Sequence, residues 1–348
     1  MKLFYKLKAH LRYWLASFSK PKKKLLILKL DSIGDYILFR NFLKELKKSE
    51  QYSGYEITLC GNMWWKDLAE RLDRNEIHEF IWVDYFKFSD WAYKNKIFSL
   101  VVNKKFETII HPTYSRDEYS DQIVRFSGVK NCIGYDGDYI NISKVHRSKF
   151  DVYYKQLIKG EDGIVFEFNR NRYFFENLLN KKLTNVKFEI EANAENDNSI
   201  VICPGAKDVE RRWATSHFIE LINKIKNREP EAIIILCGGK EDIKNGQEIN
   251  SKLENKVLDL TGKITLVELI SIFAKAKLIV TNDSGPFHLA AALGKRVICI
   301  SNGTNYGRFT PYPSAINCTS TVIYSNEGKI EDINKIGVDT IVKTIYHA

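Results

Sequence analysis

The stretch LIVTNDSGPFHLAAA, residues 278–292, decides the fold class. It begins as a short apolar run typical of a buried strand, passes through a polar turn with glycine and proline, and ends in small helix-forming residues. Pro286 suits the start of a helix, and the alanines let that helix lie close to a sheet. Free N–H groups at such a helix start favour an anion such as phosphate. The pattern predicts a strand–turn–helix unit with an anion site.

The same alternation of apolar runs and helical patterns extends through the chain from Leu25 onward. It is typical of a parallel sheet with crossover helices, the α/β class. In the first half we expect strands at 25–30, 55–60, 79–83, 108–111 and 131–135, and helices at 36–48 and 164–180. In the second half we expect strands at 200–203, 232–237, 257–260, 278–281 and 297–300, and helices at 215–227 and 330–346.

A polar stretch rich in Asn, Lys and Glu, residues 181–198, is the expected linker between the halves. The predicted organisation is a leading helical segment at 1–24, a Rossmann-like domain at 25–190, and a second at 191–348. The half on which the last helix packs is left open. Two doubly wound parallel sheets of this kind are expected to face a central cleft lined by the carboxyl ends of their strands.

The leading segment concentrates the basic charge. Residues 1–24 hold eight Lys and Arg and no acid, so the remaining chain carries only +2 of the net +10. On a helix, the Leu, Phe and Trp side chains of residues 1–20 gather within an arc of roughly 120° that excludes the cations. This predicts a helix lying on an anionic membrane surface, with packing on the protein's own body as the alternative. Because the excess belongs to one segment, nucleic acid is not an expected partner.

Several other classes lack their signals. Six scattered cysteines suit buried thiols in a reducing cytoplasm, and neither a signal peptide nor an apolar run of the ~18 residues typical of a membrane span is evident. Without G-x-G-x-x-G or a Walker loop, a dehydrogenase or nucleotide hydrolase is not favoured. The motif Asp136-Gly137-Asp138 matches a metal-binding Asp-x-Asp, but we interpret it as a turn.

A second candidate loop, DSIGD at residues 31–35, joins the first expected strand to its helix. Gly34 permits a tight turn there. Asp35 falls in the first turn of the helix, where a carboxylate serves as a cap or takes a proton from a hydroxyl group. The loop by itself leaves both roles open.

A third loop, CPGA at residues 203–206, opens the second half and is followed by Lys207, Arg211 and Arg212. A glycine turn with three nearby cations predicts a seat for a diphosphate. The alternative is a surface loop with solvated arginines, in which Trp213 only anchors the next helix. His288, taken alone, is more often a structural histidine.

Together these loops resemble the ADP-heptose:lipopolysaccharide heptosyltransferase family, glycosyltransferase family 9, whose members have the two-domain GT-B fold. The resemblance extends from Leu25 to Tyr312, and its most specific parts are DLTG at 259–262, Leu266 and TNDSGPFHLAAALG at 281–294. The loops at 32–35 and 204–206 and the pair Arg212-Trp213 follow in the family's order and spacing. It makes 25–190 the acceptor domain and 191–348 the nucleotide-sugar donor domain.

The resemblance implies specific roles. Asp35 matches the general base, which deprotonates the acceptor hydroxyl for direct, inverting attack on the donor. Neither a metal ion nor another cofactor is expected. The implied donor-binding residues are Gly205, Arg211, Arg212, Asp242, Asp283, Ser284, Gly285, Pro286 and His288, and the acceptor-side loop contributes Asp31, Ser32 and Gly34.

This chain departs from the family pattern at three of these positions. Arg211 stands where the family often has a phosphate-binding lysine, which keeps the charge and changes the geometry. Asp31 stands where many members have Ser, and Lys29 where many have Arg. The last two departures predict a difference on the acceptor side.

The leading hypothesis is transfer of heptose from ADP-heptose to a lipopolysaccharide core or related lipid-linked saccharide, on the inner face of the cytoplasmic membrane. One alternative is that the donor is another nucleotide sugar, because no motif in the sequence indicates recognition of the adenine base or of the seventh carbon of heptose. A second is an epimerase or hydrolase of the same shape, which needs further carboxylates or histidines. A third is a non-catalytic membrane-associated nucleotide-sugar-binding protein, against which the presence of Asp35 argues.

Overall fold

The structure is a computed structural model that describes residues 22–192, 194–254, 256–316 and 318–347. They form two compact units, and each is described by itself. Unit 1 comprises the described residues up to Gly163 together with Phe168–Val186, and unit 2 comprises Ile164–Glu167 and the described residues from Lys187 onward. The helix predicted at residues 1–20 lies outside the described residues.

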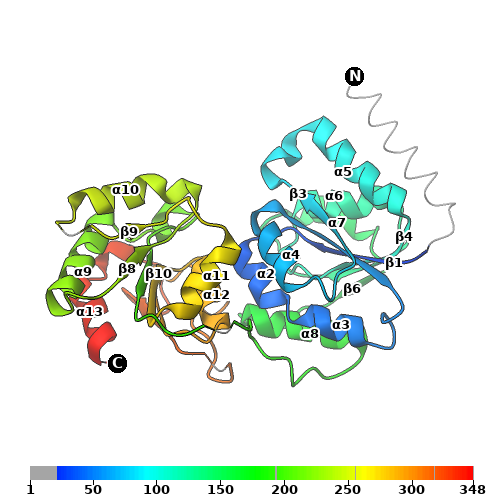
Figure 1. The fold of residues 1–348 in the computed structure, drawn as a ribbon. Helices are drawn as coiled ribbons and strands as arrows, with labels where there is room; N and C mark the ends of the chain where they lie inside the picture. The colour runs from blue at the N-terminus through cyan, green and yellow to red at the C-terminus, as the bar shows by residue number, and fades with distance from the viewer. Residues whose placement is uncertain (1–21, 193, 255, 317, 348) are drawn as a thin grey trace. The chain divides into compact units, whose positions relative to one another are not determined.

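Unit 1 is built on a six-stranded parallel sheet in the order β3-β2-β1-β4-β5-β6. Helices α5 and α6 lie on one face of this sheet, and α3 and α8 lie on the other (Figure 1). The strands are β1 Lys22–Lys29, β2 Glu56–Asn62, β3 Glu79–Val83, β4 Phe106–His111, β5 Asn131–Tyr135 and β6 Gln156–Ile158. The α-helices are α2 Ile33–Phe39, α3 Phe42–Lys48, α4 Lys66–Leu72, α5 Trp91–Lys104, α6 Glu118–Ser127, α7 Lys144–Asp151 and α8 Glu167–Leu179, with 3-10 turns η1 Met63–Trp65 and η2 Tyr85–Ser89.

Unit 2 repeats the architecture with a parallel sheet in the order β12-β11-β10-β7-β8-β9. Helix α13 packs beside α9 within this unit (Figure 1). The strands are β7 Ile200–Cys203, β8 Ile234–Leu236, β9 Leu258–Asp259, β10 Leu278–Asn282, β11 Val297–Ser301 and β12 Ser320–Tyr324. The helices are α9 Thr215–Arg228, α10 Ile243–Lys252, α11 Leu266–Lys275, α12 Gly285–Ala292 and α13 Val338–His347, with η3 Val209–Arg211, η4 Lys240–Asp242 and η5 Ile333–Lys335.

Both sheets have the doubly wound order in which the direction of winding reverses between the first and fourth strands of the unit. In unit 1 the reversal lies between β1 and β4, and in unit 2 between β7 and β10. Loops that leave such a pair diverge to opposite faces and open a crevice at the carboxyl end of the sheet, where ligands bind in open α/β sheets. The prediction of two doubly wound parallel sheets is confirmed, and the predicted loops begin at these two points.

The strands read as continuous apolar runs because helices cover both faces of each sheet. In β1, all four side chains from Leu25 to Leu28 are fully buried. In unit 2, each of the four residues of β7 is buried as well. A parallel sheet of this kind needs no polar face, which explains why the sequence showed runs rather than alternation.

Strand β1 begins at Lys22, although the sequence predicted that Lys22–Lys24 would follow a leading helix. The backbone of this segment pairs with both neighbours, Lys24 with Glu56 of β2 and Lys22 with Phe106 of β4. Lys24 also forms an ion pair of 3.3 Å with Glu56. Pairing on two sides therefore extends the strand through a basic segment that local preference would leave outside it.

The single helix predicted at 36–48 is two helices, α2 and α3, separated at Arg40 and Asn41. The Nδ2 of Asn171, on α8, donates to the main-chain carbonyl of Leu38 at 3.3 Å. Leu43 N then donates to Arg40 O, a tighter turn than an α-helix makes. The break depends on a residue more than a hundred positions away, which local periodicity does not report.

The last predicted helix, 330–346, is likewise shorter, because α13 begins only at Val338. It is preceded by η5, whose first turn is capped by Asp332 through the N–H of Asn334 at 3.0 Å. The edge strands β6 and β12 were not predicted; β6 has three residues and β12 has no fully buried side chain. Within the described ranges, no helix is long and apolar enough to span a bilayer.

An aromatic cluster joins α3 to α8 beneath the sheet of unit 1. Phe42 stacks on Phe175 at 5.4 Å between ring centroids and lies 5.0 Å from the ring of Phe168. All three rings are buried. The cluster thus packs α3 against α8 through three buried rings.

We expect Phe42→Ala to lower the free energy of unfolding of unit 1 by about 3–5 kcal/mol, because it removes a fully buried ring and leaves a cavity. Phe86, which is 72% exposed, supplies the matched control. Phe86→Ala should change the same quantity by less than about 0.5 kcal/mol. Urea denaturation followed by fluorescence measures both, and equal losses in the two variants would contradict the packing described here.

Candidate active site

The predicted donor-side loops meet at the point in unit 2 where β7 and β10 lie side by side. Asn282 at the end of β10 donates from Nδ2 to the carbonyl of Pro204 at 2.7 Å. Ser284 donates from Oγ to the carbonyl of Gly205 at 3.3 Å. These bonds join the loop after β7 to the start of α12, so two predicted motifs that are far apart in the sequence form one surface.

Helix α12 begins directly at this surface. Ser284 is its N-cap in an extended conformation, and Gly285 and Pro286 occupy the first turn. The N–H groups of a first turn have no partner within the helix and carry partial positive charge. The six residues that follow, Phe287 to Ala292, are all buried, which fixes the helix against the sheet. The predicted anion-accepting helix start is therefore formed, and its ligand remains a prediction.

Asp283 holds the neighbouring loop through both of its carboxylate oxygens. Oδ2 accepts from Ser301 Oγ at 2.9 Å, and Oδ1 accepts from Asn305 Nδ2 at 3.1 Å. The side chain is buried, and burial raises the pKa of Asp283 although both hydrogen bonds act in the opposite direction. This residue thus ties the start of α12 to the end of β11 and the loop that follows it, and any contact with a sugar would add to these bonds.

Arg211 bridges the same loops. Its Nη1 donates to the carbonyl of Asp283 at 3.2 Å, and its Nη2 lies 2.5 Å from Asp208 Oδ2. Arg212 donates from Nε to the carbonyl of Ala206 at 2.6 Å and so closes the loop after β7. Both guanidinium groups are bonded and half-buried, in contrast to the alternative of solvated surface arginines.

Gly205 and Asp242 are in close contact at the ends of β7 and β8. A Cβ added to Gly205 would lie 2.2 Å from the Oδ2 of Asp242, closer than any real side chain allows. Asp242 accepts from the N–H of Gly239 at 2.9 Å and is 5% exposed. Burial raises the pKa of its carboxyl group. A side chain at position 205 would therefore displace the carboxylate of Asp242 from its present place.

His288 is the fourth residue of α12. Its Nδ1 is 2.7 Å from the hydroxyl of Tyr312, and its ring contacts those of Phe287 and Phe309. Burial, with a smaller contribution from the charge of Arg211, lowers the pKa of His288 to about 3. The ring is buried, bonded to Tyr312 and packed on two phenylalanines, which is what a structural histidine requires. A role of His288 in donor binding remains a prediction.

The predicted acceptor-side loop of unit 1 follows β1. Asp35 is the third residue of α2, and its Oδ2 accepts from the N–H of Ser32, the N-cap, at 3.2 Å. Gly34 beside it is buried, whereas Ser32 and Asp35 are half-buried. Ser32, and not Asp35, is therefore the N-cap, and Asp35 contributes to capping as the third residue of the helix. This contribution does not conflict with a role as a base, because an ionised carboxylate has several acceptor positions.

Asp31, in the same loop, is bound to a buried cation. The ammonium group of Lys29, at the end of β1, is fully buried and lies 2.8 Å from Asp31 Oδ2. Thr113, from the loop after β4, donates to the same oxygen at 3.3 Å. A buried ammonium group needs an anionic partner. The two departures from the family pattern on this side are therefore one ion pair.

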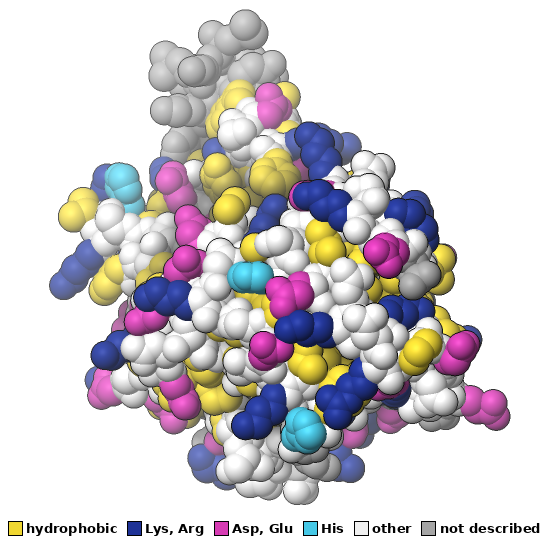
Figure 2. All heavy atoms as spheres, turned by 90° about the vertical axis from the view of Figure 1, so that its left-hand side faces the viewer, with side chains coloured by type: hydrophobic (Ala, Val, Ile, Leu, Met, Phe, Trp, Pro, Cys, Tyr) yellow, Lys and Arg dark blue, Asp and Glu magenta, His cyan; other side chains and the backbone are white. Residues whose placement is uncertain are grey.

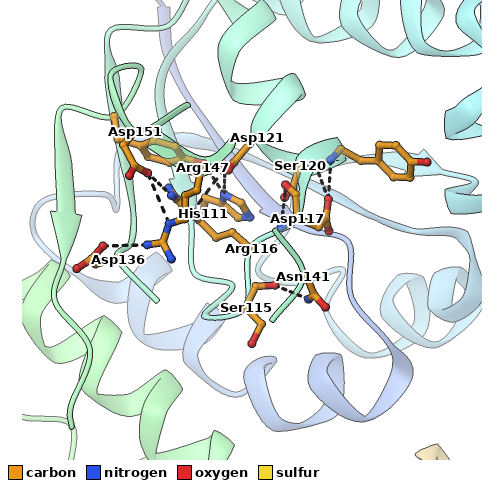
Figure 3. A network of polar contacts seen from close by, with 12 residues as sticks. His111, Ser115, Arg116, Asp117, Ser120, Asp121, Asp136, Asn141, Arg147 and Asp151 are labelled. Atoms are coloured by element: carbon orange, nitrogen blue, oxygen red, sulfur yellow. Dashed lines mark hydrogen bonds and ion pairs between the residues drawn. The ribbon is translucent and has the colours of Figure 1, made fainter. Parts of the chain in front are cut away.

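The loop after β4, residues 112–117, was not singled out in the sequence, and it meets Asp31 through Thr113. A buried polar network lies behind it (Figure 3). His111 Nδ1 is 2.7 Å from the Tyr154 hydroxyl, which donates to Asp121 Oδ1 at 2.6 Å. Burial, and then the charge of Arg116, lowers the pKa of His111 well below its usual range. The available signal was a polar run that directly follows an expected strand.

Asp136 belongs to the same network (Figure 3), and Asp138 is joined to it through Arg147 and Ser115. Arg147 donates from Nη2 to Asp136 Oδ1 at 2.8 Å and from Nη1 to the carbonyl of Asp138 at 2.6 Å. Asp138 Oδ2 accepts from Ser115 Oγ at 2.8 Å. Gly137 between them has a φ of 55°, which favours glycine in a turn. In the described part of the chain, no three His, Cys, Asp or Glu side chains are grouped so as to hold a metal ion.

Comparison with known proteins adds a family assignment to this geometry. The model of glycosyltransferase family 9 (heptosyltransferase) matches residues 119–336, more than half of the chain. The lipooligosaccharide heptosyltransferase 2 of Haemophilus influenzae is 29% identical over 156 residues, which are 43% of this chain and 43% of that protein. The match to this relative thus covers less than half of its length.

Two further similarities cover nearly the whole chain. Lipooligosaccharide heptosyltransferase 2 of Haemophilus ducreyi is 24% identical over 335 residues, 90% of this chain and 91% of that protein. The solved structure of ADP-heptose LPS heptosyltransferase II from E. coli covers 92% of this chain and 97% of its own, with a TM-score of 0.71 and 18% identity. This likeness confirms the predicted GT-B type of fold. The match of the family model shows that the chain belongs to glycosyltransferase family 9, the heptosyltransferase family.

Proposed function

We propose that this chain is an inverting glycosyltransferase that moves a heptose from ADP-heptose to a lipopolysaccharide core or related lipid-linked saccharide. The proposal is supported mainly by the contacts that bring the Gly205 loop, Arg211 and the start of α12 together in unit 2. These contacts lie where β7 and β10 are adjacent and the direction of winding reverses. A solved structure of similar fold is that of the E. coli ADP-heptose LPS heptosyltransferase II. The family match supports the same class of donor for this chain.

The donor diphosphate fits the start of α12. The N–H groups of the first turn and the guanidinium of Arg211 supply positive charge without a metal ion. The carboxylate of Asp242, which lies beside Gly205, would accept a hydrogen bond from a ribose hydroxyl of the donor, as the resemblance implies. The proposal includes no metal, because these groups offset the charge that develops on the leaving diphosphate.

The acceptor hydroxyl is activated by Asp35. Its carboxylate removes the hydroxyl proton while the acceptor oxygen bonds to the anomeric carbon of the donor and the bond from that carbon to the diphosphate oxygen breaks. ADP leaves, and the anomeric configuration inverts. Of the two carboxylates in this loop, Asp35 is the one that matches the general base of the family, whereas Asp31 forms an ion pair with the buried Lys29.

The nucleotide is tested first by thermal stabilisation with ADP, UDP, GDP and CMP sugars. A ligand at a hundred times its dissociation constant should raise the melting temperature of unit 2 by roughly 5–10 °C, and we expect this with ADP-heptose. Gly205→Ala should reduce the shift strongly, because the new Cβ displaces Asp242. Gly54→Ala is the control, since nothing lies within 4 Å of its added Cβ. If the melting temperature rises only with another nucleotide sugar, that sugar replaces ADP-heptose as the proposed donor. If no nucleotide sugar raises the melting temperature, the proposal is contradicted.

The base is tested with two substitutions. Asp35→Asn keeps an oxygen that can accept from the Ser32 N–H but cannot take a proton, whereas Asp35→Ala removes the cap as well. Both should lower kcat by about 10²–10⁴-fold while the thermal shift with ADP-heptose is kept. Only Asp35→Ala should lose stability, by about 1 kcal/mol. Normal turnover by Asp35→Asn would remove Asp35 from the mechanism.

We further propose that residues 1–20 hold the protein to the inner face of the cytoplasmic membrane, because their sequence joins an apolar arc to a basic face. Deletion of residues 1–20 should reduce co-sedimentation with anionic vesicles and leave the melting temperature unchanged. Unchanged sedimentation with a lower melting temperature would instead indicate a helix packed on the protein.

A further inference from the structure

Two aromatic side chains meet at the carboxyl edge of the sheet of unit 1. Trp64 belongs to η1, which follows β2, and Phe86 belongs to η2, which follows β3. Their ring centroids lie 5.3 Å apart, and the ring planes are tilted by 52°. The last residues of the two parallel strands, Asn62 and Val83, are paired, so both turns leave the sheet at one edge. Ligands bind at this edge in open α/β sheets.

These two residues, which we call the aromatic pair, are accessible to solvent. Phe86 is 72% exposed, and among the described residues it is the only exposed phenylalanine. Trp64 is half-buried. One exposed hydrophobic side chain needs no explanation, whereas two rings in contact begin a contiguous patch, and such patches mark interaction sites. On the face of the molecule drawn in Figure 2, by contrast, hydrophobic side chains are interspersed with charged ones.

Trp64 lies between two residues that bond to the loop after β1, the loop that carries the proposed base. On one side, Asn62 accepts from the N–H of Trp64 at 3.2 Å through Oδ1. The same side chain donates from Nδ2 to the carbonyl of Leu30 at 2.8 Å. On the other side, Trp65 donates from Nε1 to the carbonyl of Asp31 at 3.0 Å. These bonds fix the aromatic pair beside the acceptor-side loop.

Charged side chains adjoin the aromatic pair. Asp84 caps η2 by accepting from the N–H of Phe86 at 3.2 Å, and its other oxygen lies 3.0 Å from Lys87 Nζ. A sugar ring has a matching division, because its C–H groups form an apolar face and its hydroxyl groups lie around the rim. The C–H groups carry partial positive charge and are attracted to the negative face of an aromatic ring. An acyl chain would make no use of the charged neighbours.

We propose that the aromatic pair stacks on a sugar ring of the acceptor saccharide and thereby helps to determine which acceptor is used. The ring face would lie on Trp64 and Phe86, and its hydroxyl groups would reach Asp84 and Lys87. The hydroxyl to be glycosylated would then be presented to the loop after β1. This role rests on the proposed transfer to a saccharide, whereas the stacking itself is measured without donor or turnover.

The test is calorimetric titration of the full chain with deacylated, heptose-deficient lipopolysaccharide, with no nucleotide present. We expect Trp64→Ala and Phe86→Ala each to weaken binding by about three- to tenfold, because one stacking partner is lost. Phe86→Tyr keeps a ring and should bind as the unmodified chain does. Phe86→Leu keeps apolar area without a ring and should lose as much as Phe86→Ala. Leu100→Ala, at a 40% exposed position on α5, is the matched control and should have no effect.

The remaining outcomes separate the alternatives. Equal binding by the alanine variants and the unmodified chain overturns the proposal. Full binding by Phe86→Leu excludes stacking, and binding of acylated lipopolysaccharide alone makes the acyl chain the occupant. If the unmodified chain sediments as a dimer that Phe86→Ala dissociates, the occupant is a second copy.

Failure of the proposed function gives a different result. If the unmodified chain does not bind the deacylated saccharide, the proposed acceptor is rejected together with the stacking. If it binds and the alanine variants bind equally well, only the stacking is rejected. The thermal shift with ADP-heptose is measured on the same variants and should match that of the unmodified chain. Its absence from the unmodified chain would reject the proposed donor without affecting the titration.

Discussion

The pairing of β7 with β10 is the constraint on which the donor-side arrangement depends. These strands are adjacent and parallel although about 75 residues separate them, and Thr281 pairs with Cys203 at their carboxyl ends. One loop then turns to each face of the sheet, and Asn282 and Ser284 bond across the opening to the carbonyls of Pro204 and Gly205. Without this pairing, Arg211 and the start of α12 would have no common surface. The equivalent pairing of β1 with β4 brings Thr113 to Asp31.

Much of this arrangement could be predicted from the sequence, because strands buried on both faces give continuous apolar runs. The limits of β3, β5 and β7 match their predicted ranges. The errors have non-local causes. Lys22–Lys24 is part of β1 because β2 and β4 pair with this segment. The helix after β1 breaks near Leu38, whose carbonyl accepts a hydrogen bond from the side chain of Asn171. Such pairings leave no trace in local periodicity.

In the candidate site, too, features with a local sequence signal could be predicted, and features that depend on distant contacts could not. The turns around Gly205 and Gly285 were evident from residue type and spacing, because few residues allow a tight turn before a helix. The partners of their neighbours were not. That Asp283 holds Ser301 and Asn305, and that Asp242 fills the space beside Gly205, follows from contacts between separate loops. Residue type thus predicted the turns, while the hydrogen bonds among the polar groups of separate loops became evident only from the fold.

The Lys29–Asp31 pair has a consequence for how this side of the protein can diverge. Serine at position 31 would remove the carboxylate that lies 2.8 Å from the fully buried ammonium group of Lys29, and the loss of one partner of a buried ion pair destabilises a protein. Arginine at position 29 would keep the positive charge that pairs with Asp31, whereas serine at position 31 would remove the negative one. Substitution is therefore constrained more tightly at position 31 than at position 29 as long as a cation stays buried there.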